Sequence, residues 1–317
     1  MQIITDTEFH MSRSCCVAIG KFDGIHVGHR KLLEQVLAAK EDGLAAVVFT
    51  FYPSPYALFS GEKQEELTTR AEKRELFAEM GIDVLWEFPM NRSTAAMEPG
   101  AFIEQVLVGQ LRAKVIAAGS DVSFGHKGAG DMELLKRYAR MYDFEVAEIE
   151  KVCIGGMPVG STQVRNEVRA GHMEQVRKLL GRPYTFKGTV CHGRKLGKKL
   201  DMPTVNLIPE EGKLFPPFGV YYSRVKIGAE LYRGITNIGR KPTVGEAEAV
   251  GVETYLYDFS EDVYGSVIEV QLLSYKRPEQ RFASVEALKE QLAADRSEGD
   301  IYFSEHYDSR YGGHSSF

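Results

Sequence analysis

The stretch from residue 15 to 31, CCVAIGKFDGIHVGHRK, constrains the fold of this chain more than any other. A short apolar run ends at Gly20, and a helical apolar pattern begins at His26 and His29. A strand that ends in glycine and passes into a helix directs backbone N–H groups and the positive helix end toward an anion. The glycines alone fit a plain connector equally well, but His-x-Gly-His at the helix start favours a nucleotide phosphate site.

The first half of the chain alternates strand-like and helix-like segments. The strand-like runs are 15–19, 45–51, 84–88, 115–118 and 144–149, and helical patterns lie near 30–41, 70–80, 99–111 and 131–142. This alternation predicts a doubly wound, parallel α/β sheet. Ligands of such sheets bind beyond the carboxyl ends of the strands. The loops expected to bind ligand are therefore 20–29, 51–56, 119–128 and 155–165.

After Gly181-Arg182-Pro183 the pattern changes, and we place a domain boundary between residues 183 and 184. Short segments rich in β-branched and aromatic residues follow at 185–191, 219–227, 231–238, 252–258 and 266–275. A helical pattern returns only at 285–294. This organisation predicts an antiparallel barrel or sandwich closed by one C-terminal helix, followed by a loose tail from Ser304.

Composition excludes several function classes. The net charge is −5 and each half carries slightly more acidic than basic residues, so we expect no nucleic-acid partner. No apolar run is long enough to cross a membrane, and the N-terminus lacks a signal pattern, so we expect a cytoplasmic protein. The spacing of Cys15, Cys16, Cys153 and Cys191 favours neither disulfides nor a zinc site. The sequence leaves the oligomeric state open.

Two further loops of the first half carry candidate ligand-binding residues. Ser161 and Thr162 stand at a helix start with Arg165 one turn later, which fits either an ordinary cap or a second phosphate clamp. Asp121 and Phe124 follow a buried strand and offer a carboxylate and an aromatic ring to a planar ligand.

The second half holds a basic, glycine-rich stretch that begins at residue 188. Gly193, Lys195 and Gly197 could wrap a polyphosphate or form a solvated basic turn, and the Walker A spacing is absent. Thr204 and Asn206, two apart on an extended segment, point the same way and suit a nucleotide-bound Mg²⁺. Glu253 lies on a predicted strand whose other residues on the same face are apolar. It is a candidate general base for the attack of a hydroxyl on a γ-phosphate. Alternatively, it is an ordinary surface glutamate.

Together these motifs resemble the prokaryotic bifunctional riboflavin kinase/FMN adenylyltransferase family, also called FAD synthetase. The resemblance covers roughly residues 12–303 in motif order. The matching motifs are 20–29 (GKFDGIHVGH), 50–55 (TFYPSP), 119–125, 161–165, 180–184 (LGRPY), 203–206 (PTVN), 237–243 (NIGRKPT), 252–259 and 264–265.

The resemblance implies a Rossmann-like nucleotidylyltransferase domain over residues 1–183 and a β-barrel riboflavin kinase domain over residues 184–317. The barrel would transfer the γ-phosphate of ATP to the 5′-hydroxyl of riboflavin, giving FMN. The first domain would transfer AMP from a second ATP to FMN, giving FAD and pyrophosphate.

The resemblance also assigns roles to residues. Glu253 would be the kinase base, and Thr204 and Asn206 would hold Mg²⁺. His26, His29 and Arg165 would stabilise and orient the phosphates in adenylyl transfer. The residues expected to bind nucleotide or flavin are Gly20, Phe22, Asp23, Gly24, Gly28, Asp121, Phe124, Ser161, Thr162, Gly193, Lys195, Gly197, Thr204 and Asn206.

The chain departs from the family pattern in three places. Tyr52 replaces a usual acidic or histidine residue, Val122-Ser123 replaces Phe-Arg, and Asp201 replaces a glycine. The alternatives are a single-activity or regulatory flavin-binding paralogue and a nucleotidylyltransferase with another acceptor. The sequence disfavours a dehydrogenase, because no strand is followed by G-x-G-x-x-G.

Overall fold

The computed structural model describes residues 1–61, 65–191, 204–242 and 248–307. The chain divides into two compact units, Met1–Gln163 and Val164–Phe317. The domain boundary between residues 183 and 184 stays a prediction. No helix within the described ranges combines the length and apolar character needed to cross a membrane.

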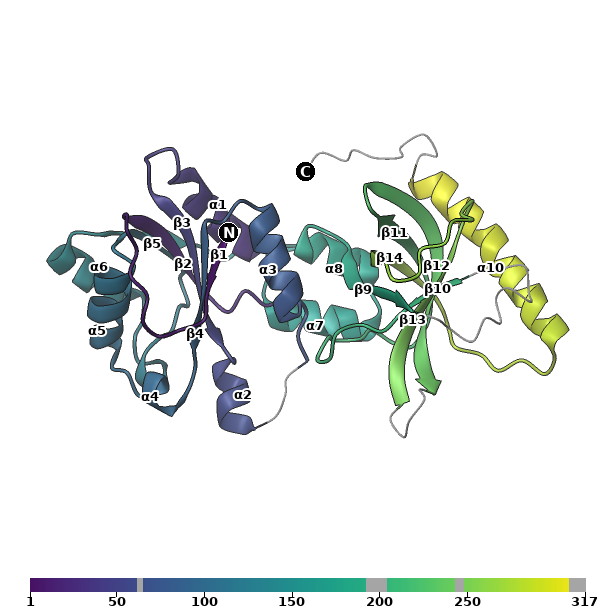
Figure 1. Cartoon of the computed structure of the whole chain (residues 1–317), viewed down its shortest axis with the longest axis horizontal. Helices are drawn as coiled ribbons and strands as arrows, with labels where there is room; N and C mark the ends of the chain where they lie inside the picture. Colours follow the sequence, from purple (N-terminus) through teal and green to yellow (C-terminus); the bar gives the residue numbers. More distant parts are fainter. Residues whose placement is uncertain (62–64, 192–203, 243–247, 308–317) are drawn as a thin grey trace. The chain divides into compact units, whose positions relative to one another are not determined.

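The first unit is built on a six-stranded, wholly parallel sheet, as the alternation predicts (Figure 1). The strands, in spatial order, are β1 (Gln2–Ile4), β4 (Val84–Pro89), β3 (Ala45–Tyr52), β2 (Cys15–Ile19), β5 (Ala113–Gly119) and β6 (Glu145–Ile149). Edge strand β1 was not predicted because its three residues carry no readable period. A small hairpin, β7 (Cys153–Ile154) and β8 (Met157–Pro158), follows the sheet.

Helices cover both faces of the sheet. The helices of this unit are α1 (Val27–Ala38), α2 (Pro55–Ser60), α3 (Arg70–Glu79), α4 (Arg92–Ala95), α5 (Pro99–Ala101), the π-helix η1 (Phe102–Gln110), the 3-10 turn η2 (His126–Gly128) and α6 (Met132–Tyr142). Apolar residues of α1 and α3 pack on one face, and those of η1 and α6 on the other. The single helix predicted over 99–111 is therefore a short α-turn that continues as a π-helix.

Strand β2 lies at the centre of both cores. Cys15, Val17 and Ile19 face the core under η1 and α6, whereas Cys16 and Ala18 face the core under α1 and α3. Burial raises the pKa of both adjacent thiols to about 12, so these cysteines act as small apolar residues. All four cysteines are free, as the spacing predicts.

The second unit contains a closed, antiparallel six-stranded barrel, so the barrel prediction is confirmed (Figure 1). The strands, in spatial order, are β10 (Thr204–Leu207), β13 (Glu248–Leu256), β12 (Glu230–Pro242), β11 (Gly219–Ile227), β14 (Val267–Pro278) and β9 (Tyr184–Cys191). Two helices precede the barrel, α7 (Ser161–Ala170) and α8 (Met173–Leu180), and they are separated at Gly171 as expected. Helix α8 packs against β9 and β14.

The closing helix α10 (Val285–His306) is longer than the predicted 285–294. The segment from Asp295 to Asp300 is polar and holds a glycine, so its sequence suggests a loop. Packing overrides that pattern, because Asp295 is buried and accepts hydrogen bonds from Arg277 and Gln291. Gly299 leaves room for the ring of Tyr257, whose hydroxyl donates to the backbone oxygen of Arg296.

We expect Asp295→Ala to lower the free energy of unfolding of the barrel unit by about 3–5 kcal/mol, because the largely buried Arg277 would keep its charge without its carboxylate. Urea unfolding followed by circular dichroism measures this loss, and the fluorescence of the single Trp86 reports the other unit separately. Asp300→Ala is the matched control on the same helix. Its exposed pair with Arg233 should contribute less than about 1 kcal/mol. Equal losses in the two variants would contradict this account of α10.

Candidate functional site

The turn between β2 and α1 is strained and tightly packed. Phe22 and Ile25 adopt positive φ angles of 51° and 41°, which are unusual for residues with a side chain. Both side chains are fully buried, and the Phe22 ring packs edge-on against Phe77 at a centroid distance of 5.5 Å. Burial of the two side chains therefore offsets the backbone strain and holds the turn in one conformation.

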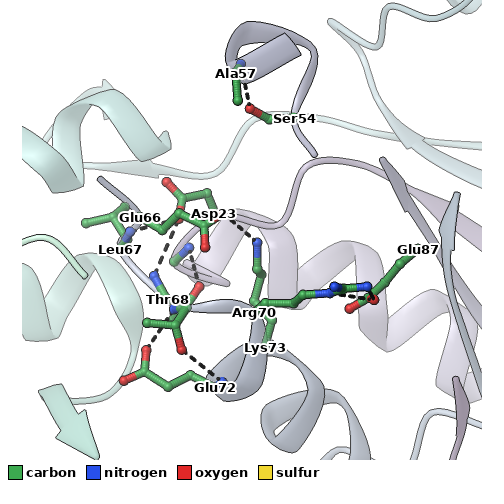
Figure 2. Close-up of polar contacts among 12 residues, drawn as sticks. Asp23, Ser54, Ala57, Glu66, Leu67, Thr68, Arg70, Glu72, Lys73 and Glu87 are labelled. Atoms are coloured by element: carbon green, nitrogen blue, oxygen red, sulfur yellow. Dashed lines mark hydrogen bonds and ion pairs between the residues drawn. The ribbon is translucent and has the colours of Figure 1, made fainter. Parts of the chain in front are cut away.

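Asp23 fastens this turn to two other loops. Its carboxylate accepts hydrogen bonds from the backbone N–H groups of Leu67, at 2.9 Å, and Thr68, at 3.4 Å (Figure 2). The backbone N–H of Gly24 donates to the Thr68 hydroxyl at 3.0 Å, and the Ser161 hydroxyl donates to the backbone oxygen of Asp23 at 2.8 Å. Asp23 and Ser161, both predicted to bind ligand, thus also determine the shape of the turn.

His26 and His29 meet at the first turn of α1, as the three-residue spacing predicts. Nδ1 of His26 accepts the backbone N–H of His29 at 3.3 Å and caps the helix. The two rings are stacked, with centroids 3.7 Å apart and an interplanar angle of 17°. Gly28 lies against this stack, since a Cβ at that position would be 3.2 Å from the His26 ring.

The environment of His29 keeps its imidazole neutral. Burial, reinforced by the neighbouring His26, lowers the pKa of His29 well below its ordinary value. Its Nδ1 atom is buried and has no hydrogen-bond partner among the described residues. A buried polar atom of this kind, at a helix N-terminus, fits an approaching anionic ligand.

An apolar pocket of about 290 Å³ opens at the carboxyl ends of β3 and β4 and beside the loop after β5. Its walls are mainly aromatic and thioether side chains: Phe51, Phe59, Phe88, Phe102, Phe124, Met90 and Met97. Ser123 and Lys127 also line it. A pocket with aromatic walls suits a planar ligand.

In the barrel, polar side chains converge on Glu253. The Thr204 hydroxyl donates to Oε1 of Glu253 at 2.6 Å. Asn206 on β10 and Asn237 on β12 both stand directly opposite Glu253 in the strand register, so the three side chains share one face of the sheet. The buried hydroxyls of Ser223, Thr236 and Thr254 bond to one another at 2.7 and 2.8 Å and maintain this register.

Comparison with known proteins identifies both units. The family model for FAD synthetase matches residues 8–163, and the model for riboflavin kinase matches residues 180–303. The bifunctional riboflavin kinase/FMN adenylyltransferases of Escherichia coli strain K12 and Listeria monocytogenes are 36% and 34% identical to this chain. Each alignment covers 91% of this chain and 93% or 92% of the relative. The chain belongs to the bifunctional riboflavin kinase/FMN adenylyltransferase family.

A solved structure has a similar fold over nearly the whole chain. A Streptococcus pneumoniae protein described as a macrolide-efflux protein is 29% identical, with a TM-score of 0.85 over 95% of this chain and 99% of its own. As a family member, the present chain is an enzyme that phosphorylates riboflavin to FMN and adenylylates FMN to FAD. The comparisons give no support to the impaired-paralogue alternative.

The structure brings together some of the predicted site residues of this chain and separates others. Phe124 lines the apolar pocket, whereas Asp121 is not among the lining residues and forms an ion pair with Lys151 at 2.9 Å. Thr162 and Arg165 lie in the first two turns of α7. Gly193, Lys195, Gly197 and Asp201 lie outside the described residues.

Two groups of site residues were not predicted. The pocket walls Phe59, Phe88 and Phe102 lie outside the loops expected to bind ligand and read as ordinary apolar residues, because only the tertiary fold places them around one space. Asn237 could have been found, since it begins the motif NIGRKPT and stands alone among β-branched neighbours. Its position beside Glu253 could not have been predicted, because it depends on the pairing of β12 with β13 in the folded barrel.

We expect His29→Gln to flatten the pH dependence of stability of the α/β unit. Because the pKa of His29 is lower in the folded than in the unfolded chain, the unfolded chain binds the proton first as pH falls. The contribution of His29 to the free energy of unfolding is therefore complete above the pKa of histidine in the unfolded chain, about 6.5. Below that pH the free energy of unfolding falls by at most about 1.4 kcal/mol per pH unit for this one proton. Urea unfolding followed by Trp86 fluorescence at pH 7.5, 6.5 and 5.5 measures the slope.

The control for this measurement is His126→Gln, which removes an exposed histidine of the same unit. It should retain the pH slope of the unsubstituted protein. A His29→Gln protein with the unsubstituted slope would contradict the lowered pKa of His29.

Proposed function

We propose that riboflavin phosphorylation takes place at Glu253 and that adenylylation of FMN takes place at the His26–His29 stack. The observation that supports the kinase assignment is the 2.6 Å hydrogen bond from Thr204 to Glu253, with Asn206 opposite on the neighbouring strand. The adenylyl-transfer assignment is supported by the unpartnered, buried Nδ1 of His29 at a helix N-terminus.

In the kinase step the 5′-hydroxyl oxygen of riboflavin attacks the γ-phosphorus of ATP. The bond from that phosphorus to the β–γ bridging oxygen breaks, and ADP leaves. Glu253 accepts the hydroxyl proton on one carboxylate oxygen. The hydrogen bond from Thr204 holds the other oxygen, so it orients the carboxylate toward the substrate hydroxyl.

The residues around Glu253 also fit a magnesium ion. The hydroxyl of Thr204 keeps its lone pairs when it donates its proton, and the Asn206 side chain adds an amide oxygen. These hard oxygen donors lie on one face of β10, and we propose that they hold Mg²⁺ together with the ATP phosphates. Bound there, the ion would neutralise the charge of the transferred phosphate.

In the adenylyl-transfer step a phosphate oxygen of FMN attacks the α-phosphorus of ATP. The bond to the α–β bridging oxygen breaks, and pyrophosphate leaves. The nucleophile is already ionised, so the protein needs no strong base. The imidazole N–H groups of His26 and His29 would donate to the phosphates, as would the backbone of the 20–28 turn, and Arg165 would orient them.

The apolar pocket is the proposed site for the flavin ring of FMN. Phe124 and the facing aromatic side chains offer stacking surfaces for a planar, three-ring system. The turn at Asp23 and the pocket both open at the carboxyl edge of the same sheet, which is the edge where doubly wound folds bind ligand.

We expect substitutions at the two sites to affect the two reactions independently. Glu253→Gln should lower FMN formation from riboflavin by about 10²- to 10⁴-fold, since the base is lost. The same variant should convert supplied FMN to FAD at the unsubstituted rate. His29→Gln should show the opposite pattern. The measurement is chromatographic separation of flavins after incubation with ATP and Mg²⁺. A Glu253→Gln enzyme with normal kinase turnover would refute the assignment.

A second variant tests the role of Thr204. Thr204→Val removes the hydroxyl and keeps the shape of the side chain, so FMN formation should fall by about 10- to 100-fold, and adenylylation should not change. Thr185→Val on β9 of the same barrel is the control and should retain both activities. If Thr204→Val leaves the Mg²⁺ dependence and rate of FMN formation unchanged, Thr204 has no part in the kinase site.

A further inference from the structure

A buried carboxylate with two arginines lies on the face of the sheet covered by α3. Glu87, on β4, is 4% exposed. Arg70 donates to its Oε2 through Nε at 2.8 Å and Nη2 at 2.5 Å, and Arg74 donates to both oxygens at 2.9 and 2.5 Å. Burial acts to raise the pKa of Glu87, but the hydrogen bonds from Arg74 and Arg70 lower it below its ordinary value. Figure 2 shows Arg70 held against this carboxylate.

Arg70 makes a second contact that Arg74 does not share. Its guanidinium carbon lies 3.7 Å from the centre of the Tyr52 ring. Among the described residues, Arg70 is the cation that stacks on this ring. Tyr52 is 39% exposed, so the Arg70 guanidinium covers part of a ring that is otherwise partly open to solvent. Glu87 thus fixes Arg70, and Arg70 in turn fixes Tyr52.

Tyr52 is the last residue of β3, next to the wall of the apolar pocket. Phe51 precedes it, and the chain continues into α2 through Ser54, which caps the helix at Ala57 (Figure 2). Helix α2 supplies Pro55 and Phe59 to the pocket lining. None of the six residues of α2 is buried. The Ser54 cap joins this helix directly to the Tyr52 end of β3, so a shift of that end would be passed on to the part of the pocket wall that α2 supplies.

We propose that Arg70 is a positioning residue for adenylyl transfer. Fixed on Glu87, it holds Tyr52 and thereby the 51–59 wall in the geometry that the flavin of FMN fits. Neither Arg70 nor Tyr52 lines the pocket, so both act on the substrate only through that wall. The proposal rests on the assignment of this pocket to the flavin ring.

The test compares Arg70→Ala with Arg74→Ala. The two arginines share the buried Glu87 and have similar exposure, 30% and 32%. The variants therefore share the loss of a charge partner and differ in the contact with Tyr52. We expect Arg70→Ala to raise KM for FMN about three- to tenfold with kcat within twofold, the size of a lost cation–π contact. Arg74→Ala should leave KM for FMN within twofold.

Variants at Tyr52 test whether the ring transmits the effect. Tyr52→Phe keeps the stacking face and should leave KM for FMN unchanged, whereas Tyr52→Leu should raise it as Arg70→Ala does. The double variant Arg70→Ala/Tyr52→Leu should be no worse than either single one, because both remove the same contact. Riboflavin phosphorylation, measured on the same preparations, should be unchanged throughout.

Phe59→Ala separates the proposal from the assignment of the pocket. If Phe59→Ala raises KM for FMN and Arg70→Ala does not, the positioning role is refuted and the flavin pocket stands. If neither variant changes KM for FMN, the positioning role of Arg70 and the assignment of the pocket to the flavin ring are both refuted. Equal increases in Arg70→Ala and Arg74→Ala would also refute the positioning role, since they would show a general cost of exposing Glu87.

Discussion

The α/β unit depends on the carboxylate of Asp23. This carboxylate accepts backbone N–H groups of the segment before α3 and so joins that segment to the turn that leads into α1. The backbone oxygen of Asp23 accepts the hydroxyl of Ser161. Three loops that are distant in the sequence are therefore held at one edge of the sheet. The stacked pair of His26 and His29 begins immediately after this junction. Loops at such an edge have few partners of their own, so this one multiply bonded residue determines where the His26–His29 pair lies.

Each unit also contains a buried carboxylate that joins two elements. In the first unit Glu87 on β4 binds two arginines of α3, and in the second Asp295 on α10 binds Arg277 of β14. A buried charge is costly unless it is paired, so the elements that carry the partners must stay in contact. In the first unit α3 carries Arg70 against Tyr52, beside the apolar pocket, and in the second α10 packs against β12, the strand next to Glu253.

The two sites obtain their geometry in different ways. In the α/β unit the important groups are at a helix start and in loops, and strained backbone at Phe22 and Ile25 is retained by burial. In the barrel the groups stand on strands, and pairing places Thr204, Asn206 and Asn237 around Glu253. The barrel site therefore depends on register, and the ladder of buried hydroxyls opposes a shift that would turn Glu253 to the other face.

The sequence by itself determined the family, both fold classes and most of the regular elements, because periodicity and local motifs are encoded by neighbouring residues. It also indicated the facing histidines and the Thr204–Asn206–Glu253 group, whose chemistry is readable from residue type and spacing. Tertiary structure alone decided the length of α10, the separation of Asp121 from the pocket, the aromatic pocket walls and the Glu87–Arg70–Tyr52 contact. These features arise between residues far apart in the chain, where packing and buried charge override local propensity.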